Sequence, residues 1–228
     1  MSKRSIFIAT PSYQVPVSQY YVSVLETLRA LEAAGHRVRW REWERCCYVH
    51  TARNALCAEF LLGAYDDLLF IDNDLGWNAA EMVRLCSHEV DIVGAAAPFR
   101  HGPEGFPCYV ATDADGRGRM NDAGLLEVTT LPTAVMKISQ QTLLDIGAAK
   151  LAPLRISRSH DGKETGRYLS FFDFEADNVN HLEYGEDVSF CRKCQRIGKK
   201  LLVDPDFTIS HFGPNFRTGN LKKHVFGE

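Results

Sequence analysis

Two carboxylates one residue apart are the most informative feature of this sequence. Asp72 and Asp74 follow the apolar run Leu68-Leu69-Phe70-Ile71, which is typical of a strand buried on both faces of a sheet. In an extended chain both carboxylates point the same way, and two such anions repel unless a cation lies between them. Hard oxygen ligands suit Mg²⁺ or Mn²⁺. An acidic turn that caps a helix starting near Asn78 explains the pair equally well, and both interpretations stay open.

The elements around this pair alternate between strand and helix. Their order, βαβαβαβ, predicts an α/β fold with an open mixed, mostly parallel sheet and helices on both faces. Ligands of such sheets bind beyond the carboxyl ends of the strands, which is where Asp72 and Asp74 lie. We expect strands at 5–9, 38–40 with Trp43, 68–71 and 91–95, and helices at 18–34, 50–63 and 78–86.

The second half of the chain is less regular. Residues 102–118 are rich in Gly, Pro and Asp and are expected to form loops around an irregular strand at 106–110, and residues 152–167 to form a mobile loop. No linker separates two domains, so residues 1–228 are interpreted as a single domain. The other expected elements are one or two strands within 125–138, helices at 139–146 and 185–197, and strands at 200–203 and 207–210.

Composition excludes several classes of protein. The 26 Lys and Arg residues against 29 Asp and Glu give a net charge of −3, which excludes a wholesale polyanion binder but leaves local basic patches open. No apolar run reaches the about 20 residues of a membrane span, and no signal peptide is expected, so a cytoplasmic location is predicted. The seven cysteines indicate reduced thiols. The CxxC of Cys191 and Cys194 has no second pair, so we expect one thiol in the core and the other at the surface.

Motifs for several other chemistries are absent from the sequence. There is no GxGxxG after a strand, no GxxxxGK[ST] phosphate loop, no GxSxG elbow and no HExxH. A dinucleotide fingerprint, a P-loop, a hydrolase serine and a zincin site are therefore not indicated.

Four ordered motifs resemble those of GT-A fold glycosyltransferases, which use nucleotide-diphosphate sugars with a divalent metal. Asp72-Asn73-Asp74 resembles the DxD motif, and Thr51-Ala52-Arg53-Asn54 resembles the "ARN" signature of small phage and bacterial members. Residues 131–137 resemble the acceptor-side strand, although Pro132-Thr133-Ala134 replaces the usual glycines and leaves the shape of the acceptor pocket open. The resemblance covers roughly residues 6–213, and its C-terminal part is Gly185-Glu186-Asp187, Asp204-Pro205 and His211-Phe212-Gly213.

The resemblance implies roles for the charged residues. Asp72, Asp74 and His211 would hold Mn²⁺, or Mg²⁺, against the donor diphosphate. Asp187, with Glu186 beside it, would face the acceptor hydroxyl, as general base if transfer inverts the anomeric centre. The helix dipole also favours acidic residues in a first turn, so these two stay open to a purely structural explanation. The residues expected to contact the nucleotide or sugar are Thr10, Pro11, Tyr13, Arg53, Asn54, Asp72 and Asn73.

The function predicted from the sequence is therefore a metal-dependent glycosyltransferase of a bacterial or phage-infected cytoplasm. Residues 1–100 would form its nucleotide-sugar-binding half, and residues 101–228 its acceptor-binding half with the metal-ligand tail. Alternatives are a nucleotidyltransferase and a non-catalytic module that binds a nucleotide sugar or nucleic acid. A basic rim would suit a hydroxymethylated pyrimidine in phage DNA or an anionic glycan. Its residues are Arg155, Arg158, Lys163, Arg167, Arg217, Lys222, Lys223 and His224.

Overall fold

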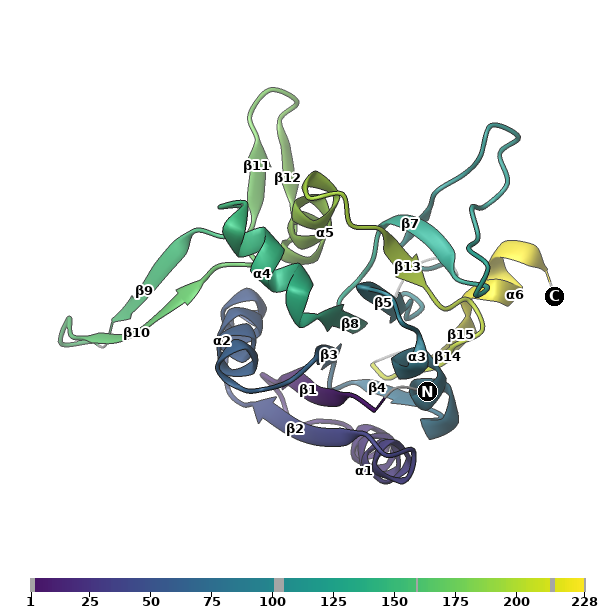
Figure 1. The fold of residues 1–228 in the computed structure, drawn as a ribbon, viewed down its shortest axis with the longest axis horizontal. Coiled ribbons are helices and arrows are strands. Elements are labelled where there is room, and N and C mark those ends of the chain that lie inside the picture. The colour runs from purple at the N-terminus through teal and green to yellow at the C-terminus, as the bar shows by residue number, and fades with distance from the viewer. Residues whose placement is uncertain (1–2, 101–104, 159, 214–215, 228) are drawn as a thin grey trace.

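The computed structural model describes residues 3–100, 105–158, 160–213 and 216–227, which form a mixed sheet with helices on both faces (Figure 1). This confirms the predicted α/β class. The helices described are α1 (Ser18–Ala33), α2 (Val49–Leu62), α3 (Ala79–Ser87), α4 (Gln140–Ala148), α5 (Glu186–Arg196) and α6 (Leu221–Phe226). The strands of the large sheet are β1 (Ser5–Pro11), β2 (Arg37–Trp43), β3 (Asp67–Ile71), β5 (Ile92–Ala95), β6 (Tyr109–Val110), β7 (Leu126–Thr130), β8 (Val135–Ser139) and β13 (Leu201–Val203). Smaller sheets contain β4 (Leu75–Trp77), β9 (Leu154–Arg158), β10 (Glu164–Leu169), β11 (Glu175–Asp177), β12 (Leu182–Tyr184), β14 (Thr208–His211) and β15 (Arg217–Asn220).

The large sheet is mixed, with the strand order β2-β1-β3-β8-β5-β13-β7-β6. Strand β1 is parallel to β2 and β3, and β13 is parallel to β5. The other neighbouring pairs are antiparallel, because β8 enters between β3 and β5 in the opposite direction and β7 pairs in the same way with β13 and β6. The prediction of a mostly parallel sheet is therefore wrong. Since β8 lies between strands of the first half, the sheet joins the two halves of the chain.

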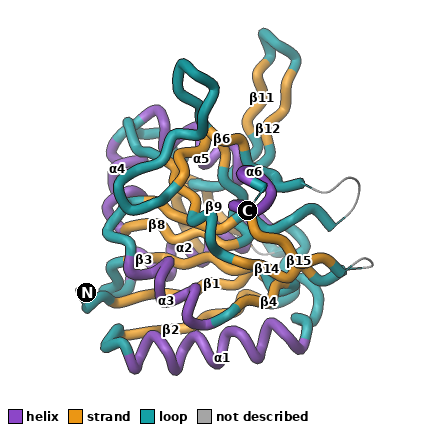
Figure 2. Tube along the Cα trace, turned by 90° about the vertical axis from the view of Figure 1, so that its right-hand side faces the viewer, coloured by secondary structure: helices purple, strands orange, loops and turns teal. Residues whose placement is uncertain are grey.

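Alternating side chains of each central strand pack on opposite faces of the sheet. In β3, Leu68 and Phe70 belong to the core cluster under α2, α4 and α5, whereas Leu69 and Ile71 belong to the cluster under α1 and α3. All of β3 is buried, which confirms the prediction of a strand covered on both sides. Figure 2 shows α1 running along the β2 side of this sheet.

Two helix ends show why the helices lie where the sequence predicts. Helix α1 is followed by Gly35 at φ 88°, a left-handed conformation that glycine adopts without strain. The side chain of Asn78 accepts a hydrogen bond of 2.8 Å from the amide of Ala80, which confirms it as the N-cap of α3. The helices expected at 50–63, 139–146 and 185–197 correspond to α2, α4 and α5.

Three small sheets lie outside the large one. Strands β4, β14 and β15 form an antiparallel sheet beyond the ends of β1 and β3 that face away from the N-terminus (Figure 2). The hairpins β9-β10 and β11-β12 project from the body (Figure 1). The mobile loop predicted for residues 152–167 is thus wrong, because most of it forms β9 and β10. Of the loops expected at 102–118, residues 102–104 lie outside the described part of the chain, and the strand expected there is the two-residue β6.

Both thiols of the CxxC are buried, so the expectation of one surface thiol is wrong. The apolar face of α5 is wide enough to bury two positions three residues apart. Burial raises the pKa of Cys191 to about 12 and that of Cys194 well above its ordinary value. The structure therefore uses these thiols as core side chains. No helix in the described ranges is both long and apolar enough to cross a membrane.

Candidate active site

The two aspartates of the DxD motif lie in a turn between β3 and β4. The backbone amide of Asp72 donates to the carbonyl of Ala134 at 2.9 Å, which fixes the turn against the start of β8. The sequence analysis assumed an extended chain from Asp72 to Asp74. The structure instead has a turn at Asn73 and Asp74, which leads into β4. Burial and the nearby Asp74 raise the pKa of Asp72, while the charges of Arg53 and His211 act the other way.

Pairing of β4 with β14 brings His211 to the DxD turn. His211 is opposite Leu75 in the antiparallel register, so it lies beside the residue that precedes β4. The amide of Phe212 also donates to the carbonyl of Asp74 at 2.8 Å. As a result, the Nε2 atom of His211 lies 3.5 Å from Oδ2 of Asp74, although the two residues are far apart in the sequence.

The ring of His211 has a defined orientation. Its Nδ1 lies 2.7 Å from the carbonyl oxygen of Pro98, and because a carbonyl only accepts, Nδ1 carries the proton. Nε2 is then the nitrogen that faces Asp74. Burial lowers the pKa of His211, but the bonds to Asp74 and to the Pro98 carbonyl outweigh it, so the net shift is upward. The Asp74 carboxylate therefore favours a positive charge on the imidazole.

Arg53 joins the DxD turn to the start of α5. Its guanidinium is buried, with Nη2 at 3.1 Å from Oδ1 of Asp72 and Nη1 in an ion pair with Glu186. Its Nε is buried and has no hydrogen-bond partner among the described residues. The two carboxylates neutralise this arginine and hold it in place. The contact of Arg53 with a phosphate, expected from the sequence, stays a prediction.

One cavity of about 520 Å³ is lined by these charged side chains and the imidazole, except for Asp74. It is lined by residues from α2, from the segment after β5, from the turn before β8, from the start of α5 and from the end of β14. Thr133 and Ala134, which stand where the resembling family has glycines, form part of its wall. The charged residues and the imidazole of the lining are Arg53, Asp72, Arg100, Glu186, Asp187 and His211.

Arg100 was missed in the sequence. It follows the segment Ala95-Ala96-Ala97-Pro98-Phe99 after β5, and its Nη1 lies 2.9 Å from Oδ2 of Asp74. The signal was available, because side chains just past the carboxyl end of a strand are well placed to meet a ligand. Arg100 is half-exposed, so it is the arginine of the cavity that a soluble anion reaches most easily.

The residues expected around the nucleotide base do not line this cavity. Thr10 is fully buried and its hydroxyl is bonded to that of Tyr20. Tyr13 is exposed and lines a separate hollow of about 240 Å³. Asn73 connects the DxD turn to this hollow, because its Nδ2 donates to Ser12 Oγ at 2.7 Å and to the carbonyl of Gln14 at 2.9 Å. The buried Pro11 ends β1 before this segment.

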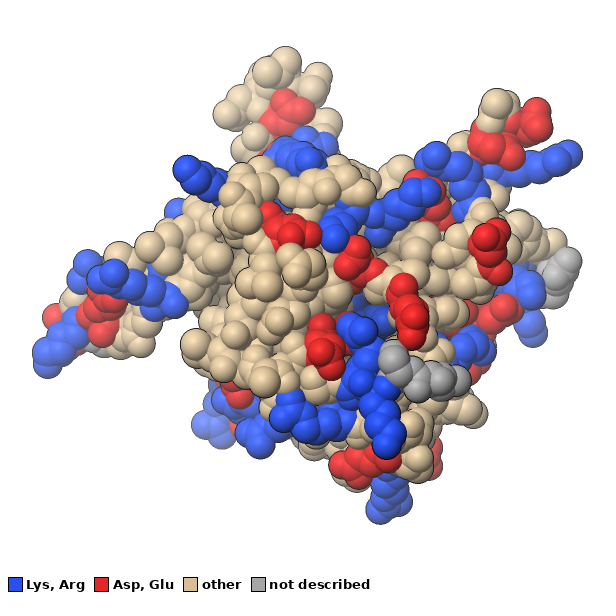
Figure 3. Space-filling model, in the orientation of Figure 1, with Lys and Arg blue, Asp and Glu red and all other residues tan. Residues whose placement is uncertain are grey.

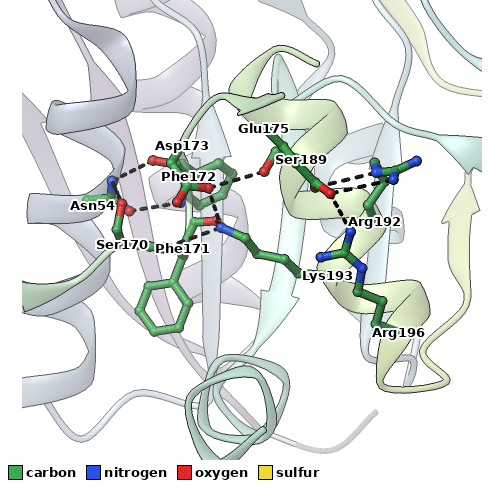
Figure 4. A network of polar contacts seen from close by, with 10 residues as sticks. All are labelled: Asn54, Ser170, Phe171, Phe172, Asp173, Glu175, Ser189, Arg192, Lys193 and Arg196. Carbon is green, nitrogen blue, oxygen red and sulfur yellow. Dashed lines mark hydrogen bonds and ion pairs between the residues drawn. The ribbon is translucent and has the colours of Figure 1, made fainter. Parts of the chain in front are cut away.

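Asn54 clamps the backbone of Phe172 instead of lining the cavity. Its Nδ2 donates to the Phe172 carbonyl at 2.6 Å and its Oδ1 accepts from the Phe172 amide at 2.9 Å. Figure 4 shows that Lys193 of α5 holds the same segment through the carbonyls of Ser170 and Phe171 and through Asp173. The helices that carry Arg53 and Glu186 are thus fixed to one strip of backbone.

The two basic segments do not form one rim. Arg155, Arg158, Lys163 and Arg167 lie on the β9-β10 hairpin, whereas residues 217–224 belong to β15 and α6 on the opposite side of the molecule (Figure 1). The expectation of a continuous basic rim around the site is therefore wrong.

Asp74 and His211 fit a divalent cation as a pair. The Nδ1–H bond to Pro98 is the arrangement that orients a metal-binding imidazole, with Nε2 directed at the carboxylate. A cation that also binds a diphosphate needs only one or two protein ligands, since phosphate oxygens and water complete its shell. Within the described ranges no three His, Cys, Asp or Glu side chains are grouped as a metal site. Asp72 contacts Arg53 rather than this pair.

Among solved structures, the comparison finds a distant likeness to a glycosyltransferase. No family model matches the chain, and no curated protein does either. A solved structure described as "crystal structure of a glycosyltransferase involved in the glycosylation of the major capsid of PBCV-1" is similar at a TM-score of 0.35 and 12% identity. The alignment covers 61% of this chain and 62% of that one, so the chain spans less than two thirds of that protein's length. A likeness this distant carries no weight for the activity, which has to be inferred from the residues of the chain itself.

Proposed function

We propose that this protein is a glycosyltransferase that binds a nucleotide-diphosphate sugar in the cavity beyond β3. The observation that supports this most directly is the convergence of Asp72, Arg53, Glu186 and His211, from four distant segments, on one hollow at the carboxyl end of a central strand. The ordered motifs of the sequence and the geometry thus single out the same residues.

In this proposal the donor diphosphate lies between Arg100 and the pair of Asp74 and His211. Asp74 and His211 would hold Mn²⁺ or Mg²⁺, and the bound ion would supply positive charge to offset that of the diphosphate. Arg100 exchanges its ion pair with Asp74 for a bidentate contact with a phosphate. Asp72, neutralised by Arg53, faces the sugar or ribose hydroxyls.

In this proposal, Asp187 is the residue that faces the acceptor hydroxyl. Its Oδ1 accepts from the amide of Val188 at 2.7 Å, and the residue lines the cavity at the start of α5. Glu186, bound to Arg53, fixes the position of this helix end. Asp187 therefore serves as the general base of an inverting transfer or orients the acceptor in a retaining one.

We place the acceptor in a second hollow of about 530 Å³, which shares Pro98 with the first. Its lining includes Phe106, Phe216 and Lys223, a combination that suits a ring-bearing anion. A hydroxymethylated pyrimidine in DNA and an anionic glycan both have this chemistry. Faster turnover with one of these two acceptors than with water would identify the class.

Thermal stabilisation tests the donor assignment. The full chain is melted with UDP-glucose, UDP-N-acetylglucosamine, GDP-mannose and dTDP-glucose, each with and without Mn²⁺. We expect a rise in Tm that requires both ligands, because binding to the folded state alone stabilises it. Asp74→Asn should abolish the rise, and Asp122→Asn, an exposed turn residue, should retain it. Wild-type protein that shows no shift with any of these donors contradicts the proposal.

Slow hydrolysis of the donor separates a transferase from a binding module. A transferase should release nucleoside diphosphate from the stabilising donor in the presence of Mn²⁺, since water can replace the acceptor. Binding without release indicates a non-catalytic module. Release of pyrophosphate from a nucleoside triphosphate instead indicates the alternative nucleotidyltransferase.

A further inference from the structure

Two hairpins project from the body (Figure 1), and their sequences carry opposite charges. The first, here called the basic arm, consists of residues 154–169 and contains β9 and β10. The second, the acidic arm, consists of residues 175–184 and contains β11 and β12. The basic arm has four Lys or Arg residues against two acidic ones, whereas the acidic arm has three acidic residues and no Lys or Arg.

Each arm is a two-stranded sheet with no third strand among the described residues. Both outer edges of such a ribbon present unpaired backbone groups, and an isolated two-stranded ribbon is marginally stable in water. Large apolar side chains are exposed on both arms, although each could have been polar at no cost to the body. Their exposed fractions are Leu154 58% and Ile156 45% on the basic arm, and Val179 86% and Leu182 50% on the acidic arm.

The charges of the basic arm leave a positive surplus after internal pairing. Lys163 pairs with Asp161 and Arg167 pairs with Glu164, so both acidic residues of this arm are already neutralised. Arg155 and Arg158 are exposed and have no ion pair within the described part of the chain. Figure 3 shows Lys and Arg side chains along this arm, where it extends from the left of the molecule.

The acidic arm has a matching negative surplus. Glu175 pairs with Arg192 and Arg196 of α5, which anchors the base of the arm to the body (Figure 4). Asp177 bonds only to the turn at residues 179–180, which keeps its carboxylate charged and lowers its pKa. Glu183 is exposed. Two unbalanced carboxylates on this arm thus correspond to two unbalanced guanidinium groups on the other.

We propose that the protein forms a homodimer in which the basic arm of each copy packs against the acidic arm of the other. One chain carries both halves of the contact, so a two-fold axis repeats it and closes the assembly without leaving a free arm. The pairing covers the apolar residues of both arms and matches their charges. A single contact of this kind is small against the about 800 Å² per partner of a stable interface, and the two-fold axis doubles it.

Sedimentation velocity of charge-swapped variants tests the dimer. The wild-type chain, with a mass of 25.6 kDa, should sediment as a dimer at about 50 mM salt, and more weakly at about 500 mM, where exposed charges are screened. Arg155→Glu/Arg158→Glu and, separately, Glu183→Lys should each raise the dissociation constant by about tenfold. Arg29→Glu/Arg39→Glu changes the net charge as much as the first variant, at exposed positions of α1 and β2, and should dimerise as the wild type does.

Mixing the two arm variants gives the decisive measurement. One contact of the mixed dimer then joins two native arms. In the other contact, the basic arm with Arg155→Glu/Arg158→Glu faces an acidic arm whose negative surplus is cancelled by Glu183→Lys. The mixture should therefore dimerise better than either variant alone. A wild-type chain that stays monomeric, or arm variants that dimerise as well as wild type, overturn the proposal. A monomer that retards duplex DNA through Arg155 and Arg158 also overturns it, because the basic arm then binds nucleic acid.

Discussion

Arg53 balances two carboxylates that would otherwise face the cavity without a counter-charge. Removing one partner of a buried ion pair costs much more than the pair contributes, because the remaining charge loses both water and its partner. We therefore expect Arg53→Met to lower the free energy of unfolding by about 2–4 kcal/mol, measured by urea denaturation. Adding Glu186→Gln to this variant should restore part of the loss. Full stability of Arg53→Met alone would show that the carboxylates are not paired.

His211 tests the metal pair directly, because its Nε2 faces Asp74 while Nδ1 is bound to Pro98. We expect His211→Ala to weaken Mn²⁺ binding in the presence of a nucleoside diphosphate by about 10–100-fold, measured by isothermal titration calorimetry. His160→Ala, at the exposed tip of the basic arm, is the matched control and should bind Mn²⁺ as the wild type does. Unchanged affinity in His211→Ala would remove the imidazole from the metal site.

At the scale of residues, several side chains that belong to recognisable motifs lie close together in the structure. Asp72, Glu186, Asp187 and His211 line the cavity or its edge because each belongs to a motif at the end of an element. Arg100 was missed because no motif surrounds it. The amide of Asn54 is bonded to the backbone of Phe172, and nothing local in the sequence indicates this contact.

At the scale of elements, α2 and α5 are positioned through the segment between them. Asn54→Ala removes both hydrogen bonds to Phe172 and should lower stability by about 1–3 kcal/mol, because the Phe172 backbone groups stay buried without partners. Hydrogen exchange of the Phe172 amide should accelerate. Asn78→Ala, which removes the N-cap of α3, should cost about 1 kcal/mol and leave that amide protected. Equal protection of Phe172 in both variants would contradict the clamp.

Elements with strong local patterns were predicted, and elements that depend on distant partners were not. The continuous apolar run of β3 predicts a strand buried on both faces. The spacing of the apolar residues in α1 predicts a helix with one buried face. Strand β4 has three residues and becomes a strand only through its pairing with β14. The hairpin of β9 and β10 was missed for another reason, because its charged residues hide a local signal. That signal is the alternation Leu154-Arg155-Ile156-Ser157 followed by the turn residues Asp161-Gly162.

At the scale of the whole molecule, local sequence patterns could not predict the order of the strands in the large sheet. The insertion of β8 between β3 and β5 depends on which edge each strand finds. One sequence feature is consistent with it, since a side chain on Gly94 would overlap the carbonyl of Val135 in the neighbouring β8. Sequence alone cannot assign such a close approach to one partner strand.

The acid stability of the whole fold should depend on Asp204, which follows β13 and binds α3. Burial raises its pKa, but His88 and Arg84, with Arg84 Nε at 2.9 Å from Oδ2, outweigh burial and give a net lowering. A carboxyl whose pKa is lowered by folding stabilises the fold above its unfolded pKa of about 3.9, and the effect is lost as pH falls through the lower folded value. Asp204→Asn should therefore be less stable than wild type at neutral pH, with a difference that shrinks below about pH 4.

Urea unfolding at several pH values measures this difference. The carboxamide oxygen that Asp204→Asn introduces can still accept the bond from the Asp206 amide, which Asp204 accepts at 3.1 Å in the wild type. The turn is thus preserved and the missing charge is the main change. Asp122→Asn, at an exposed turn, should follow the wild-type curve throughout. A gap between Asp204→Asn and wild type that stays constant down to about pH 3 would mean that packing, and not the charge on Asp204, connects α3 to the end of β13.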